Sequence, residues 1–154
     1  MLEFKMLNET IKECDDLIIT RVSSENIYSV MLYNTTAITK LYENLKQYKR
    51  ILILCEEVVV CVAKIIGKED YEFEKYNEIW KNNTGAWNSI IKFTDVIYLG
   101  RTIKDIFGEK TTIKNIETVG YINNIDEFNL LKREIKTMYA YHIHSELSDM
   151  GLLK

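Results

Sequence analysis

The amino-acid sequence predicts an all-α protein, an up-and-down bundle of four to six helices in one domain that covers residues 1–154. The chain holds no proline and only 6 glycines, which favours long helices over a sandwich that needs many turns. Apolar residues recur at spacings of three and four in several segments. With 154 residues, 47% of them hydrophobic, the chain can build one sizeable core.

Composition and charge narrow the classes of partner and compartment. The net charge of −3 gives no bulk attraction to nucleic acid, so any RNA contact needs a local basic patch. The odd set of Cys14, Cys55 and Cys61 indicates reduced thiols in a reducing compartment. No signal peptide is visible, and the apolar run 51–66 is interrupted by charges and too short for a bilayer. We therefore expect a cytoplasmic protein without a membrane segment.

The first half of the chain is expected to form two helices. The first has an apolar face that ends at Ser23 and Ser24, made of Phe4, Leu7, Ile11, Cys14 and Ile18. The second spans 27–66, because charges recur every seven residues at Glu43, Arg50, Glu57 and Lys64. The apolar runs ILILC and VVVCV also suit buried strands, but strands would place Glu56 and Glu57 on opposite faces of a sheet.

A helix over 27–66 would be about 60 Å long, whereas a compact domain of this size is only about 40 Å across. Either the helix breaks, at 34–36, or its excess apolar face packs on a second copy of the chain. The second alternative predicts a homodimer.

The second half of the chain is expected to hold further helices. The spacing predicts a short helix over 70–81, a turn at 82–85 and an apolar helix over 86–108 that ends at Gly108. A short helix and a hairpin both fit 109–125. Asp126 is expected to cap a final helix that ends at Gly151, with an apolar stripe of Phe128, Leu131, Ile135, Met138 and His142.

Most site chemistries find no support in the spacing of the residues. His142 and His144 are two positions apart, so on a helix they point about 160° away from each other and cannot share a metal ion. The cysteines lie on apolar faces, where burial raises the pKa of a thiol and makes it unreactive. Trp80 and Trp87 are read as core residues rather than a stacking platform. We expect no metal and no cofactor.

The two histidines of the final helix remain as candidates for chemistry. His142 continues the apolar stripe, so it is expected to face the core or a partner subunit, where it must find a hydrogen-bonding partner such as Glu146. His144 points onto the face that carries Arg133 and Lys136. A structural role is the alternative, because histidine favours the last turn of a helix.

The segment LKREIKTMYAYHIHSE resembles the last core helix of HEPN domains, and WNSIIKFTDVIYLGRTIKDIFG before it matches the layout of abortive-infection HEPN proteins. In that resemblance His142 occupies the histidine position and Lys136 the arginine position, with Arg133 and His144 nearby. The resemblance implies a dimer of a prokaryotic defence or toxin–antitoxin system that binds or cuts RNA without metal at the dimer cleft. His would act there as general acid and base.

The partners that this reading implies are a second copy, RNA, and a protein antitoxin or inhibitor target. The acidic net charge favours an alternative reading, a non-enzymatic helical interaction protein such as a phage or viral inhibitor or adaptor.

Overall fold

The computed structural model describes residues 16–39, 48–76, 78–80, 87–122 and 124–152, and its centre is a six-stranded sheet rather than a helical bundle. The strand order is β2-β5-β4-β3-β1-β6. Strands β1 and β3 run parallel, and the other neighbouring pairs run antiparallel. The strands are β1 (Leu17–Val22), β2 (Thr35–Ile38), β3 (Arg50–Cys55), β4 (Val58–Asp70), β5 (Ser89–Thr102) and β6 (Val119–Gly120). The predicted all-α class is therefore wrong.

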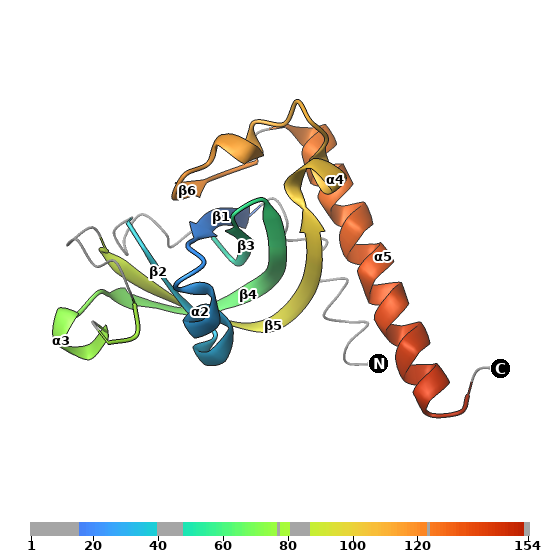
Figure 1. The fold of residues 1–154 in the computed structure, drawn as a ribbon, viewed down its shortest axis with the longest axis horizontal. Helices are drawn as coiled ribbons and strands as arrows, with labels where there is room; N and C mark the ends of the chain where they lie inside the picture. The colour runs from blue at the N-terminus through green and yellow to red at the C-terminus, as the bar shows by residue number, and fades with distance from the viewer. Residues whose placement is uncertain (1–15, 40–47, 77, 81–86, 123, 153–154) are drawn as a thin grey trace.

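Helices lie on both sides of the curved sheet (Figure 1). Helix α5, the longest described, runs beside β5 and continues beyond the sheet, whereas α2 and α3 lie near the opposite side. The helices are α2 (Ile27–Tyr33), α3 (Phe73–Tyr76), α4 (Ile103–Phe107), the 3₁₀ turn η3 (Ile113–Asn115) and α5 (Ile125–Asp149). Among the described residues, no helix is long and apolar enough to cross a membrane.

The β3–β4 hairpin explains why residues 50–66 are strands. Cys55 pairs with Val58, so Glu56 and Glu57 form the turn between the strands and belong to neither face of the sheet. Residues Ile51 and Ile53 are buried on one face and Leu52 and Leu54 on the other, the pattern of a central strand covered on both sides. The expectation of a helix failed because it assigned the two glutamates to a regular element.

Bulges curve the two long strands. The β4–β5 register shifts between Val59 and Cys61 and at two further places along the pair. Extra residues on one strand of a pair increase the local twist and bend the sheet. In β5 the bend accompanies Asp95 and Gly100, whose φ angles are 55° and 63°. The curvature brings the end of β5 and α4 against α5.

Each face of the sheet buries its own apolar cluster. The cluster on the side of α5, here called the α5 cluster, comprises Leu17, Ile19, Leu52, Leu54, Val59, Val62, Leu99, Ile103, Ile106, Phe107, Ile113, Ile122, Leu131 and Ile135. The cluster on the side of α2, here called the α2 cluster, comprises Ile18, Val22, Val30, Ala37, Ile38, Ile51, Ile53, Cys61, Ala63, Tyr76, Trp80, Ile90, Ile91 and Phe93.

Several sequence expectations change in this fold. The helix expected over 27–66 ends at Tyr33, where Asn34 takes a left-handed φ of 51°, and strands follow. The long apolar stripe that predicted a homodimer therefore does not exist as one surface. The helix expected over 86–108 is instead β5 followed by α4, although it does end at Gly108. Of the described residues in the helix expected over 70–81, only the four of α3 are helical, and Asp70 still belongs to β4.

The final helix is confirmed with two corrections. Its cap is Asn124, whose Oδ1 accepts from the amide of Asp126 at 2.7 Å, rather than Asp126 itself. Its apolar stripe packs as far as Met138, but His142 is exposed, because α5 has by then passed the sheet. The first expected helix, which was to end at Ser23 and Ser24, is wrong in its described part, because Ile18 lies in β1 (Leu17–Val22). Its earlier residues and the turn at 82–85 lie outside the described residues.

The HEPN resemblance is corrected by the same finding. HEPN domains are all-α, and a six-stranded mixed sheet excludes that fold for this chain. The same sheet therefore rules out the metal-independent nuclease at a HEPN dimer cleft. It also rules out the alternative reading, a helical adaptor.

Candidate functional site

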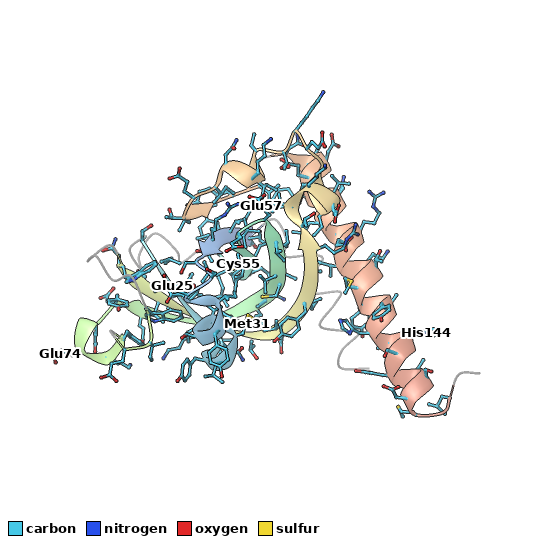
Figure 2. All side chains as sticks on the ribbon, viewed as in Figure 1. Glu25, Met31, Cys55, Glu57, Glu74 and His144 are labelled. Atoms are coloured by element: carbon cyan, nitrogen blue, oxygen red, sulfur yellow. The ribbon has the colours of Figure 1, made fainter. Side chains whose placement is uncertain are left out.

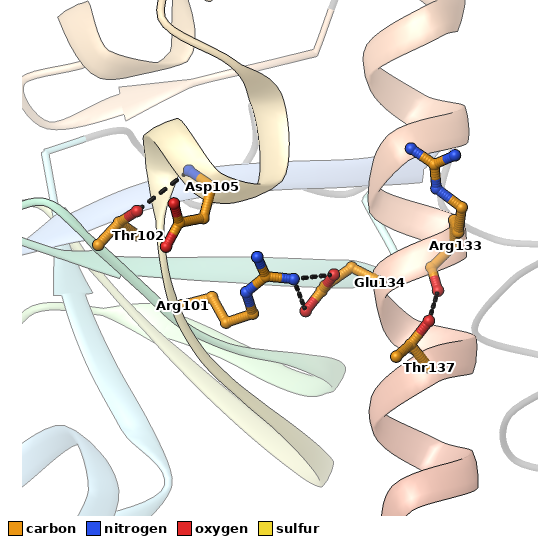
Figure 3. A network of polar contacts seen from close by, with 6 residues as sticks. All are labelled: Arg101, Thr102, Asp105, Arg133, Glu134 and Thr137. Carbon is orange, nitrogen blue, oxygen red and sulfur yellow. Dashed lines mark hydrogen bonds and ion pairs between the residues drawn. The ribbon is translucent and has the colours of Figure 1, made fainter.

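Helix α4 forms one wall of a hollowed region at the end of β5. Thr102 caps the helix, because its Oγ1 accepts from the amide of Asp105 at 3.0 Å (Figure 3). Ile103, Ile106 and Phe107 are buried in the α5 cluster and hold the helix in place. Gly108, at φ 91°, ends the helix, a backbone angle that a side chain would strain. Glu109 and Lys110, which follow directly, are exposed.

Thr111 joins this connection to the beginning of α5. Its side chain is buried, and its hydroxyl donates to the carboxylate of Glu127. The same oxygen accepts from the amide of Ile113 at 3.1 Å. One hydroxyl therefore links the 3₁₀ turn η3 to the first turn of α5 and fixes the position of Lys110 beside it.

The first hollow lies between α4 and η3 and has a volume of about 520 Å³. Lysines dominate its charged lining, and the whole lining comprises Glu57, Ile103, Lys104, Gly108, Glu109, Lys110, Thr111 and Lys114. Glu109 ties two of the lysines together: its carboxylate lies 2.7 Å from Lys104 Nζ, and its carbonyl accepts from Lys114 Nζ at 2.8 Å. The ammonium of Lys110 has no partner within the part of the chain that the structure describes.

Two further hollows continue the first. The second, about 540 Å³, shares Lys110 and Thr111 with the first and is otherwise lined by Phe107, Thr112, Asn124, Asp126, Glu127 and Leu130. The third, about 410 Å³, shares Asp126 and Leu130 with the second and adds Asn129 and Arg133. Because neighbouring hollows share lining residues, they lie next to one another, and together they are here called the α4–α5 groove.

An ion pair fixes α5 beside β5 next to this groove. Arg101 Nη1 lies 3.1 Å and 2.9 Å from the two carboxylate oxygens of Glu134, as Figure 3 shows. Glu134 is buried on α5, while the Arg101 side chain is 45% exposed. The arrangement sets the rotation of α5 and therefore which of its residues face the groove.

The four residues predicted as catalytic all lie on α5 and are exposed. Arg133 lines the third hollow, and its carbonyl accepts from the Thr137 hydroxyl at 2.9 Å (Figure 3). Lys136 lies one turn further on, outside the three hollows. The ring of His142 meets the Tyr141 ring edge-on at 6.0 Å. Figure 2 shows His144 on the distant stretch of α5, far from Glu57 at the first hollow. A catalytic role for these residues stays a prediction.

Sequence reasoning missed the lysines of the first hollow. Lys104, Lys110 and Lys114 fall within eleven consecutive positions, a local basic cluster in a chain of net charge −3. That clustering was the available signal, but the segment was read as the end of one helix and an uncertain connection.

Among the described residues, the cysteines and acidic groups offer no second site. Burial raises the pKa of Cys61 to about 12, and burial, with Glu56 beside it, also raises the pKa of Cys55 against the opposing effect of Arg21. Thiols with raised pKa values are poor nucleophiles. Within the described residues, no group of three or more His, Cys, Asp or Glu side chains is arranged to hold a metal ion.

No family model matches this sequence, and no curated protein matches it. Among solved structures, the chain resembles ASCH from Zymomonas mobilis with a TM-score of 0.48 and 9% identity, over 76% of this chain and 94% of that one. Two single-residue variants of the same protein give TM-scores of 0.47 and 0.45 at 9% and 10% identity, over 74% and 76% of this chain and 94% of each of theirs.

Proposed function

We propose that the protein binds single-stranded RNA, with the phosphate backbone lying along the α4–α5 groove. The observation that supports this most is the row of three neighbouring hollows, with three lysines in the first and Arg133 in the third. Lysine and arginine side chains along a groove attract phosphates and release condensed counterions, the main source of affinity for nucleic acid. The groove is formed by one chain, so the proposal needs no second copy.

Carboxylates also line the groove. A carboxylate that is already paired with a cation or a hydrogen-bond donor repels a bound phosphate less than an unpaired one does. Glu109 is paired with Lys104, and Glu127 accepts the hydroxyl of Thr111. Glu57 and Asp126 have no such partner among the described residues. The groove therefore carries a mixed charge, and we expect modest affinity that decreases steeply with salt.

A single strand suits the groove better than a duplex. The hollows are separate depressions of about 410–540 Å³ that share lining residues, which suits successive nucleotides rather than a continuous helical backbone. Asn129 and Thr112 provide neutral hydrogen-bonding groups on the lining, of the kind that a ribose 2′-hydroxyl can use.

The cytoplasm is the compartment that we propose for this activity. Cys55 and Cys61 are free thiols, the state that a reducing compartment maintains.

Fluorescence anisotropy with a labelled, mixed-sequence single-stranded RNA of about twelve nucleotides tests the proposal. Lys110→Ala should weaken binding several-fold at low salt and reduce the slope of log affinity against log salt by about 0.7, the value for one lost phosphate contact on a single strand. Lys75→Ala on α3, which removes the same charge far from the groove, is the control and should leave both quantities unchanged. Equal losses in the two variants, or no binding by the wild-type protein, would contradict the proposal.

A further inference from the structure

The second hollow differs in chemistry from the first. The first is lined mainly by charged side chains, whereas the second combines two apolar side chains, Phe107 and Leu130, with six polar residues, here called its polar rim. Phe107 is buried in the α5 cluster and Leu130 packs against that cluster, so both side chains are held by the core. Apolar surface can pack against a planar ring, and polar groups placed around it can fix the orientation of that ring.

The polar rim of this hollow presents a carboxylate beside two donors. The Asp126 carboxylate has no hydrogen bond or ion pair within the described residues. Asn124 Oδ1 is used by the amide of Asp126 at 2.7 Å, so the free side of that amide group is its Nδ2 donor. Lys110, which lines the same hollow, supplies a second donor.

Resting on the RNA binding proposed above, we infer that the second hollow is a base-binding subsite specific for guanine. Guanine carries two adjacent donors, N1–H and N2–H, which a single carboxylate can accept together, and an acceptor, O6, at the next position. Asp126 provides the carboxylate, and Asn124 or Lys110 provides the donor for O6.

The other bases fit this rim less well. Adenine and cytosine place a ring acceptor where guanine has N1–H, so a lone pair would face the Asp126 carboxylate. Uracil offers one ring N–H instead of two parallel donors, which leaves half of the carboxylate unused. A neutral apolar pocket would accept any base, so the discrimination depends on Asp126.

The first hollow can hold the phosphate of a nucleotide whose base lies in the second. Lys110 and Thr111 line both hollows, so a nucleotide whose base occupies the second hollow has its phosphate within reach of the lysines of the first. Lys110 thereby lies between the base and the phosphate, and Thr111 positions it through the bonds to Glu127 and Ile113.

The test uses the full-length chain and four single-stranded RNAs that are identical except for one central base. We expect the guanine strand to bind about tenfold or more tightly than the adenine strand, with cytosine like adenine and uracil between. Guanosine monophosphate should also compete with the labelled strand better than adenosine monophosphate.

Asp126→Asn should abolish this preference while the protein still binds the adenine strand at least as well, because one negative charge leaves the groove. The helix cap stays intact in this variant, since Asn124 provides it, and a thermal melt checks the fold. Asp105→Asn, which removes an exposed carboxylate from α4 outside the three hollows, is the matched control and should keep the preference.

The outcomes separate the two proposals. Wild-type protein that binds all four RNAs equally, or prefers uracil or adenine, overturns the guanine subsite but leaves RNA binding standing. A guanine preference that survives Asp126→Asn also overturns the subsite. Wild-type protein that binds none of the strands overturns both.

Discussion

The two faces of the sheet are held together in different ways. On the α5 side, buried polar groups join separate elements: Glu134 meets Arg101, and Thr111 meets Glu127. Around the α2 cluster, Trp80 Nε1, Trp87 Nε1 and Ser89 Oγ are buried and have no hydrogen-bond partner among the described residues. The α5 face is therefore fixed in orientation by bonds between side chains of different elements. On the α2 face the Ser29 hydroxyl donates to the Ile79 carbonyl at 3.1 Å, but other buried polar atoms lose water and gain no bond within the described residues.

This difference bears on where a site can form. A groove needs walls in fixed positions, and hydrogen bonds between elements fix positions better than apolar contact, which is not directional. The α4–α5 groove lies where the polar joints are. Changes to each face should therefore have different consequences, which the following variants measure.

The largest expected effect comes from truncation in the α5 cluster. Leu131 is fully buried between α5 and the sheet, and Leu131→Ala should reduce the free energy of unfolding by about 2–5 kcal/mol. Val30→Ala on the other face, also fully buried, removes two carbons and should cost about 1.5 kcal/mol at roughly 0.8 kcal/mol per carbon. Urea denaturation of both variants measures the difference. A larger loss for Val30→Ala would mean that the α2 face dominates stability.

A smaller effect should follow from breaking the ion pair. Arg101→Met leaves the buried Glu134 carboxylate without its partner and should cost about 2 kcal/mol, less than the roughly 3–5 kcal/mol of a fully buried pair because Arg101 is about half exposed. Lys75→Met, which breaks the exposed pair with Glu69, should cost under about 1 kcal/mol. Thermal or urea unfolding distinguishes the two, and equal costs would show that the Arg101 pair does not fix α5.

The two faces of the sheet also differ in how many of their elements the sequence predicted correctly. The α5 stripe of Phe128, Leu131, Ile135 and Met138 was identified correctly, because a helix on one side of a core shows a period that the sequence alone reveals. The stripe could not reveal where the sheet ends, so His142 was assigned to a buried position that is exposed.

The strands were missed for a physical reason. A strand buried on both faces has no alternation, so ILILC and VVVCV look the same as a fully apolar helix. Position in the sheet depends on pairing with distant segments, because Val58 pairs with Thr102 of β5 and Ile51 pairs with Ile18 of β1, and no local pattern encodes those partners. The α4–α5 groove was missed likewise, because it joins Glu57, the α4–η3 connection and α5 only once the sheet has folded.

A buried thiol offers a pH-dependent comparison within the α2 cluster. Burial raises the pKa of Cys61 from 9.0 to about 12, so its contribution to stability is complete below pH 9 and is lost as the pH rises towards 12. At pH 10 the loss should be about 1.4 kcal/mol, one pH unit above the unfolded pKa.

Cys61→Ala removes this dependence, so its stability relative to the wild type should improve by about that amount between pH 8 and pH 10 in urea unfolding. Cys55→Ala, at the partly exposed end of β3, should show a weaker trend. If the gap between wild type and Cys61→Ala stays constant over this range, the thiol is not desolvated in the folded state.

The smallest effect, and the one of opposite sign, is expected at Ser89. Its hydroxyl is fully buried and has no hydrogen-bond partner in the part of the chain that the structure describes, so folding removes it from water without a bond to those residues in return. Ser89→Ala deletes that hydroxyl and leaves only a small space, so the free energy of unfolding should stay the same or rise by up to about 1 kcal/mol. Thr111→Val is the matched comparison from the other face, because that hydroxyl both donates and accepts, and its loss should cost about 1–2 kcal/mol. Urea denaturation decides the sign for each variant. If Ser89→Ala destabilises the protein as much as Thr111→Val does, then the Ser89 hydroxyl is bonded in solution and the contrast between the two faces fails at that position.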